Sequence, residues 1–190
     1  ETFMVTSEKE LLEAIDSIGL PVMVKGAFYK AEKAHTSQAA LASFHKIGAE
    51  WGYPIIVQQV VSGEEMNVVC VGDGDGGSLG MLGIKKMWTT ELGKIWTGVT
   101  VRNEGMIDAT NKFLEVYKWK SAFELECLVE NENIHLIEIN PRFPAWTYFA
   151  AGVGINLPSV LLRKLLNIDI PDSKPAPEGK LYVRYTYELV

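Results

Sequence analysis

The sequence predicts an α+β fold built from a small lobe, residues 1–61, and a larger lobe, residues 62–190. Two observations carry this prediction. Helical patterns occur singly between strand-like runs, and several of those runs follow one another through short turns, as in antiparallel hairpins. The chain is also long enough for two small lobes, and it contains no internal repeat or low-complexity segment.

The small lobe begins with a helix signal. Ser7 and Glu10 form a capping box, apolar residues recur at helical spacing from Leu11 to Ile18, and Gly19 ends the pattern. A short strand at 22–24, closed by Lys25, is expected next. A helix at 37–48 and a strand at 55–59 complete the predicted lobe.

The larger lobe reads mainly as strands, at 66–71, 79–85, 94–101, 123–129, 134–139 and 181–189. Helices are expected at 107–117 and at 157–166, the second capped by Asn156, and a linker at 173–179. The run DGDGG at 73–77 resembles a calcium loop, but Gly77 and Ile84 occupy positions that need ligands. This run is therefore predicted to be a hairpin turn.

The composition excludes several classes of function. A net charge of −6 without a basic patch argues against nucleic-acid binding, and no apolar run approaches the ~20 residues of a membrane span. Cys70 and Cys127 are expected to be buried thiols in a reducing compartment, which we take to be the cytoplasm. No signal peptide precedes the first helix, and the absence of an initial Met suggests a piece of a longer protein.

An acidic hairpin carries the richest chemistry. Alternation places Glu126 on one face of the strand at 123–129, together with Glu124. A three-residue turn at 131–133 would pair Glu130 with Ile134 and Glu126 with Glu138. Residues paired in this way have Cβ atoms roughly 4.5–5.5 Å apart.

Two carboxylates at that spacing repel unless a cation or a proton lies between them. With the oxygen of Asn140 they form a donor set that suits Mg²⁺, which usually takes one or two carboxylates and keeps sites for phosphates. A solvated hairpin face, where Glu is common, explains the hairpin alone about equally well.

Further motifs favour the metal interpretation. They read EINPR at 138–142, LPVMVK at 20–25 and IIVQQVVSGEE at 55–65. In this order and spacing, with Glu126 twelve residues before Glu138, they resemble the ATP-grasp superfamily. The run GVGINLP at 152–158 resembles its carbamoyl-phosphate synthetase and biotin carboxylase branch. The resemblance implies two lobes with a nucleotide site between them.

The resemblance also implies roles for the nucleotide-binding residues. Lys25 would neutralise ATP phosphates and act in catalysis, and Glu65 would bind the ribose hydroxyls. Gln59, Val60 and Val61 would hold the adenine. Taken alone, Lys25 could equally be a surface lysine at the end of a strand, and Glu65 could be a glutamate in a turn. Residues 59–61 could be part of an ordinary buried strand.

By the same resemblance, Glu126, Glu138 and Asn140 would bind Mg²⁺, with Mn²⁺ as an alternative, and Arg142 would contact the transferred phosphoryl group. The implied enzyme is an ADP-forming ligase that joins a carboxylate to an amine or thiol through an acyl phosphate. Its substrates would be small molecules or peptides, and it would form a homodimer without contacting nucleic acid or membrane.

The chain departs from the family pattern in three places. The loop at 26–33 holds one glycine, Gly26, with Lys30 and Lys33 as substitutes for backbone donors or as solvated charges. The adenine strand has Gln58 where glutamate is frequent, and the N-terminal domain of the family is absent. A non-catalytic or regulatory ATP-binding module is therefore a second hypothesis, and a peptide-tailoring enzyme with a carrier or leader-peptide partner is a third.

Other residues fit two interpretations each. Lys85, Lys86 and Arg102 either line the groove of the larger lobe or are exposed strand-end charges. The aromatic run at 143–149 either borders the acceptor substrate or folds into the larger lobe. Core or rim positions are expected for Trp88, Trp96 and Trp119.

Overall fold

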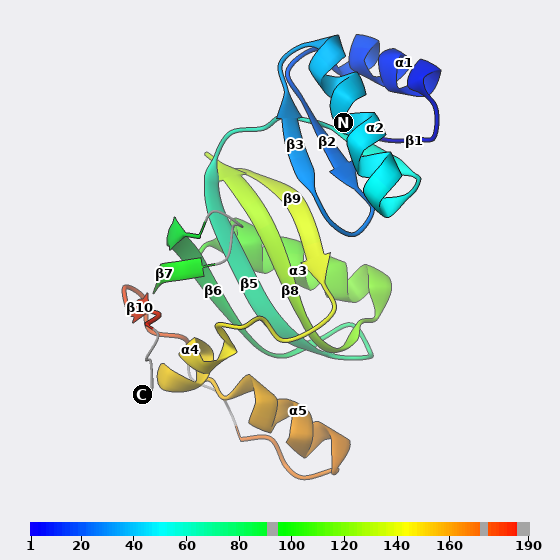
Figure 1. Cartoon of the computed structure of the whole chain (residues 1–190). Coiled ribbons are helices and arrows are strands. Elements are labelled where there is room, and N and C mark those ends of the chain that lie inside the picture. Colours follow the sequence, from blue (N-terminus) through cyan, green and yellow to red (C-terminus); the bar gives the residue numbers. More distant parts are fainter. Residues whose placement is uncertain (91–94, 172–174, 186–190) are drawn as a thin grey trace, which may run out of the picture. The chain divides into compact units, whose positions relative to one another are not determined.

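The computed structural model describes residues 1–90, 95–171 and 175–185. The chain divides into two compact units, Glu1–Val61 and Ser62–Val190 (Figure 1). Each unit has its own sheet and its own hydrophobic core.

Unit 1 is a sheet with the strand order β1-β4-β2-β3, and its neighbouring strands are antiparallel. Its elements are β1 (Thr2–Val5), α1 (Glu8–Ile18), β2 (Val22–Gly26), β3 (Ala31–Ala34), α2 (Ser37–Trp51) and β4 (Ile55–Gln59). Helix α1 starts as predicted: the Ser7 hydroxyl accepts a hydrogen bond from the Glu10 N–H at 3.3 Å.

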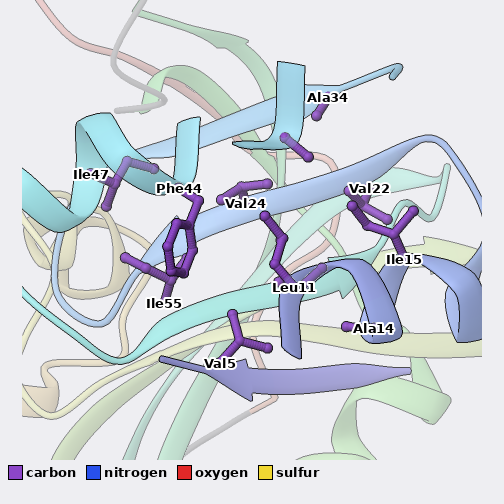
Figure 2. Packing of buried hydrophobic residues seen from close by; sticks show 12 residues of the cluster. Val5, Leu11, Ala14, Ile15, Val22, Val24, Ala34, Phe44, Ile47 and Ile55 are labelled. Carbon is purple, nitrogen blue, oxygen red and sulfur yellow. The ribbon is translucent and has the colours of Figure 1, made fainter. Parts of the chain in front are cut away.

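The core of unit 1 lies between the helices and the sheet (Figure 2). Leu11 and Ile15 from α1 meet Val22 and Val24 from β2, and Phe44 enters from α2. These side chains are almost fully buried. Alternate residues of β2 and β4 are buried against this core, while the residues between them, such as Met23 and Ile56, are half-buried, so each strand begins with a continuous apolar run.

Unit 2 is a sheet with the order β10-β7-β6-β5-β8-β9, again with antiparallel neighbours. Its strands are β5 (Glu64–Asp73), β6 (Ser78–Thr89), β7 (Ile95–Thr100), β8 (Lys120–Glu130), β9 (Asn133–Asn140) and β10 (Leu181–Val183). Its helices are α3 (Glu104–Tyr117), α4 (Thr147–Gly152) and α5 (Leu157–Leu165).

The two faces of the second sheet bury different clusters. On one face, Val68, Cys70, Phe123 and Leu125 pack with Leu114 of α3. On the other face, α4, α5 and the segment before them cover a second cluster that is centred on β5 and β6. This second cluster stops partway along the strands, and the polar residues that continue the same face form the candidate site.

The structure adds three elements that the sequence pattern does not predict: β1, β3 and α4. Strands β1 and β3 lie at the edges of their sheet and bury one residue each, so they show no clear alternation. The predicted strand at 181–189 is present at Leu181–Val183, and residues 186–189 lie outside the described residues. The start of the strand at 94 and residues 173–174 of the linker also lie outside them.

Two expectations from composition can be compared with the structure. Cys70 and Cys127 are buried free thiols, and burial raises the pKa of Cys70 to about 12 and that of Cys127 to about 11. Among the described residues, no helix is long and apolar enough to cross a membrane.

Candidate active site

The acidic hairpin pairs Glu126 of β8 directly with Glu138 of β9, as predicted. The predicted turn is wrong, because Glu130 pairs with Asn133 and the turn contains two residues, with Asn131 at φ 55°. Ile137 then forms a one-residue bulge between the pairs Cys127–Leu136 and Glu126–Glu138. The bulge compensates for the shorter turn, so both carboxylates keep the same face of the sheet.

The two paired carboxylates differ in their surroundings. The Glu138 side chain is exposed, and no hydrogen bond or ion pair engages it within the described part of the chain. Glu126 is about one-fifth exposed in its side chain, at 21%, and is held by two neighbours. Its Oε1 accepts from Asn140 Nδ2 at 3.0 Å, and its Oε2 accepts from Lys86 Nζ at 2.7 Å.

Lys86 brings the only strongly buried ammonium among the ion pairs of the described residues. It projects from β6, its side chain is 5% exposed, and it bridges Glu126 and Glu65 of β5. Burial lowers the pKa of the Lys86 ammonium, but hydrogen bonds to Glu126 and Glu65 outweigh this effect, and the net pKa is raised. Lys86 is therefore a fixed positive charge.

Glu124 is the buried carboxylate of the site. It is 3% exposed, and its Oε1 accepts hydrogen bonds from Asn67 Nδ2 at 2.7 Å and from Trp146 Nε1 at 2.8 Å. Its Oε2 accepts a longer hydrogen bond from Asn140 Nδ2, at 3.3 Å. Burial is the main cause that raises the pKa of the Glu124 carboxyl, and the hydrogen bond from Asn67 opposes it.

Asn140 and Arg142 complete the group. Asn140 is buried at the end of β9 and pairs with Glu124 across the sheet. Its amide nitrogen faces the two carboxylates of β8, while its Oδ1 accepts from Arg142 NH2 at 3.1 Å. Arg142 is mostly exposed and lies 3.8 Å from the Glu124 carboxylate. Its guanidinium is thus held beside the carboxylates with donors left for an anion.

The donor set fits a hard divalent cation. Glu126 and Glu138 offer carboxylate oxygens from adjacent strands, and Glu138 is without an ion-pair partner in the described ranges. Groups of three or more His, Cys, Asp or Glu that could hold a metal are absent there, so the protein would supply two carboxylates and an amide. That number suits Mg²⁺ shared with phosphates. To offer its Oδ1 beside Glu126, the Asn140 amide would exchange the positions of its oxygen and nitrogen.

The predicted nucleotide residues of unit 1 lie on two adjacent strands and the segment that follows. Lys25 is near the end of β2, and its Nζ donates to Gln58 Oε1 of β4 at 2.6 Å. Gln59 ends β4 with an exposed side chain that accepts from the terminal amine of Glu1 at 3.0 Å. Val60 and Val61 follow it and are half-buried. Glu65, by contrast, belongs to unit 2 and lies beside Lys86.

The loop after Lys25 is a tight connection between β2 and β3. The Gly26 N–H donates to the Lys30 carbonyl at 3.0 Å. A Cβ on Gly26 would clash with the Tyr29 carbonyl oxygen, which explains why glycine occupies this position. Lys30 lies 3.7 Å from Glu50, and Lys33 is an exposed residue of β3.

The three basic residues assigned to one groove separate in the structure. Lys86 joins the carboxylates, whereas Lys85 points to the opposite face of the sheet and pairs with Glu64. Arg102 pairs with Glu104 and lines a cavity of about 350 Å³ near the start of α3. Lys86 and Arg102 therefore line different parts of the larger lobe, and Lys85 lies on the face opposite Lys86.

The aromatic residues act mainly in packing. Trp146 and Phe149 are buried against β5 and β6, whereas Tyr148 is 82% exposed. Trp119 packs in the cluster under α3, and Trp88 lies on the surface. The run DGDGG forms the predicted hairpin turn: Asp73 Oδ1 accepts the N–H groups of residues 75, 76 and 77 at 2.7–3.0 Å.

Sequence reasoning did not place Glu124, Asn67 or Trp146 in the site. Glu124 was visible as the neighbour of Glu126 on one strand face. Asn67 lies on β5 and bonds Glu124 of β8, which is 57 residues further along the chain, and no local pattern encodes that contact. Trp146 follows the signature closely, but its indole N–H could not be assigned a partner before the fold was known.

Comparison with known proteins gives a family match for most of the chain. The family described as "ATP-grasp in the biosynthetic pathway with Ter operon" matches residues 53–188. The arginine-specific large chain of carbamoyl phosphate synthase from Bacillus subtilis is 23% identical over 190 residues, covering 91% of this chain and 18% of the relative.

Solved structures show the same fold. The biotin carboxylase domain of Hydrogenobacter thermophilus 2-oxoglutarate carboxylase, in complex with MgADP, ADP and bicarbonate, has a TM-score of 0.77 at 13% identity. The match covers 95% of this chain and 45% of that one. N5-carboxyaminoimidazole ribonucleotide synthetase from Thermus thermophilus has a TM-score of 0.74 at 18% identity, covering 94% and 50%.

A family match over most of the chain and this structural likeness establish the class: the chain belongs to the ATP-grasp family and has its α+β fold. The chain spans half or less of the length of these solved structures and about a fifth of the carbamoyl phosphate synthase large chain.

Proposed function

We propose that this chain is the nucleotide- and metal-binding part of an ATP-dependent ligase that activates a carboxylate as an acyl phosphate. The observation that carries the proposal is the facing pair of Glu126 and Glu138, with Asn140 and Arg142 beside it. Facing carboxylates that repel have no evident structural benefit, but they suit a bound cation.

The proposed division of labour follows from the chemistry of each group. Glu126, Glu138 and Asn140 hold Mg²⁺, or Mn²⁺ in its place, and the bound cation supplies neutralisation of phosphate charge. Lys25 adds a positive charge from β2, Glu65 accepts hydrogen bonds from ribose hydroxyls, and the segment from Gln59 to Val61 holds adenine.

Arg142 has a distinct proposed role. Its guanidinium is exposed and lies 3.8 Å from the Glu124 carboxylate, a contact that does not depend on which way the Asn140 amide is turned. A planar fork with free donors suits the oxygens of a transferred phosphoryl group or an acyl phosphate. Attack by an amine or thiol on the acyl carbon would then release phosphate and give the amide or thioester, leaving ADP as the second product.

The intact protein would act on small-molecule or peptide substrates as a cytoplasmic homodimer, with a further domain completing the site. A non-catalytic ATP-binding module is the second candidate. The observation that favours it is the loop of unit 1, where the Gly26 N–H is already bonded to Lys30 and Lys30 lies beside Glu50. This loop offers phosphates fewer backbone donors than a glycine-rich one.

Binding of a non-hydrolysable ATP analogue, measured by calorimetry with and without Mg²⁺, tests the proposal. We expect Mg²⁺-dependent binding that weakens at least about tenfold in Glu138→Gln and in Lys25→Met, since the first removes a charge proposed to bind the metal and the second a charge proposed to bind phosphate. Glu132→Gln in the exposed turn of the same hairpin and Lys9→Met on the surface of α1 are the matched controls.

The result separates the two candidates. Mg²⁺-dependent binding together with ADP release on addition of carboxylate and amine substrates supports the ligase. Binding without turnover in the longest available form of the protein supports the non-catalytic module. Binding that does not depend on Mg²⁺ and is unchanged in Glu138→Gln and Lys25→Met contradicts the proposed site.

A further inference from the structure

Lys86 lies where a divalent cation would compete with it. Its ammonium donates to Glu126 Oε2 at 2.7 Å, and Glu126 is also one of the two carboxylates that face each other across β8 and β9. The same ammonium contacts Glu65 of the neighbouring strand β5. One lysine thus links the carboxylate proposed for the ribose to one proposed for the metal.

The burial of Lys86 makes this pairing different from a surface ion pair. Only 5% of its side chain is exposed, so water screens its charge poorly, and Glu65 and Glu126 lie against it as counter-charges. Lys85, the next residue along the strand, is 31% exposed and pairs with Glu64 on the opposite face. The two lysines therefore form a natural pair of test and control positions.

We propose that Lys86 is a built-in counter-cation, which holds Glu126 in place while no divalent cation is bound and competes with that cation for its carboxylate. Metal binding at Glu126 then requires the ammonium to give up its hydrogen bond to that carboxylate. Glu65 keeps the displaced ammonium anchored within the site, close to where the phosphate charges would lie. Lys86 is a positioning residue in this proposal, and the proposal rests on the proposed metal-binding role of Glu126.

If Lys86 competes with the divalent cation, removing its charge should strengthen metal binding rather than weaken it. Lys86→Met keeps the length and apolar stem of the side chain but removes the competing charge. Because a divalent cation bound to Glu126 would lie within a few ångströms of the Lys86 ammonium, removing that like charge should tighten cation binding by about tenfold or more.

The experiment is a titration of the 190-residue chain with Mn²⁺ alone, without nucleotide, followed by the electron paramagnetic resonance signal of free Mn²⁺. We expect Lys86→Met, and Lys86→Gln as a polar second variant, to bind Mn²⁺ about tenfold more tightly than the wild type. Lys86→Arg and Lys85→Met should bind as the wild type does. Adding Glu126→Gln to Lys86→Met should abolish the gain.

Thermal unfolding supplies a second measurement. Without Lys86, Glu65 and Glu126 lack their shared counter-charge, so Lys86→Met should melt at a lower temperature, and Mn²⁺ should raise that temperature more than it does for the wild type. A purely structural lysine would lower the melting temperature without this larger response to metal.

The outcomes separate the two proposals. If Mn²⁺ binding depends on Glu126 but neither Lys86→Met nor Lys86→Gln tightens it, the counter-cation proposal is overturned and the metal site stands. If Mn²⁺ binds equally with and without the Glu126 carboxylate, or does not bind to any variant, both the counter-cation and the metal role of Glu126 are overturned.

Discussion

Two acidic hairpins in the sheet of unit 2 use their carboxylates in different ways. At the β5–β6 turn, one carboxylate oxygen of Asp73 accepts hydrogen bonds from three backbone N–H groups of the same turn. At the β8–β9 hairpin, Glu126 is held by side chains from other strands, and Glu138 has no partner within the described residues.

The number of protein donors around a carboxylate therefore distinguishes one that stabilises a turn from one that is available for a ligand. A carboxylate whose lone pairs are taken by nearby backbone donors stabilises a turn and has little left to offer. Glu138 faces another carboxylate and receives no donor from the described residues, so its charge is available for a cation. Glu124 lies between these cases, because it is in the site yet fully committed to protein donors.

The largest stability effect is expected at Glu124. Glu124→Ala leaves the buried donors of Asn67 and Trp146 without an acceptor and also opens a cavity, which should cost about 3 kcal/mol of unfolding free energy. Urea denaturation followed by circular dichroism measures this.

Glu124→Gln keeps the volume and one oxygen, so its cost should be smaller than that of Glu124→Ala. Glu130→Gln near the end of the same strand, where the side chain bonds only the Ser62 hydroxyl among the described residues, should change stability by less than about 0.5 kcal/mol. A Glu124→Ala variant as stable as the wild type would show that this carboxylate is not a structural acceptor.

A smaller loss is expected at Asp73. Asp73→Ala removes the acceptor of three turn N–H groups that lie partly open to water, so it should cost about 1–2 kcal/mol. Asp73→Asn keeps an oxygen in the same place and should recover part of that loss. Urea denaturation at neutral pH gives both values, and an equal loss in the two variants would argue against the hydrogen bonds as the cause.

The Asp73 effect should also depend on pH. Partial burial raises the pKa of the Asp73 carboxyl, but the backbone hydrogen bonds of the turn outweigh it, and its pKa lies below the usual value. A carboxyl with a lowered pKa contributes stability above its unfolded-state pKa of about 3.9 and loses it as the pH falls through the folded value. The gap between wild type and Asp73→Asn should therefore persist at pH 5–7 and close in more acidic solution, roughly below pH 4.

Local patterns were sufficient for most of the fold. The α1 cap at Ser7, the apolar run that begins β4 and the pairing of Glu126 with Glu138 all follow from neighbours in the sequence, and each is present in the structure. The turn of the acidic hairpin was assigned one residue too long, because a bulge at Ile137 restores the register. A turn and a bulge that compensate for each other leave the hydrophobic pattern unchanged, so the pattern cannot reveal them.

The composition of the site depended on contacts between distant strands. Lys86 reaches Glu126 across β5, and Asn67 reaches Glu124, over 40 and 57 residues of chain. The order of strands in the sheet decides these contacts, and a single sequence does not specify that order. Lys85 and Lys86 show the consequence: they are adjacent in sequence, but only the fold shows which of them faces the carboxylates.

The smallest stability effect, and the sharpest contrast, is expected at Glu138. Glu138→Gln removes a charge that faces Glu126 and has no partner in the described part of the chain, so unfolding free energy should stay within about 0.5 kcal/mol of the wild type. Relief of repulsion between the two carboxylates would make any change a slight gain. Urea denaturation without metal measures the stability, and the calorimetric titration with Mg²⁺ and an ATP analogue measures the binding. A residue whose loss leaves the fold intact but weakens Mg²⁺-dependent binding serves the ligand, whereas a loss of stability comparable to that of Glu124→Ala would make Glu138 a structural residue.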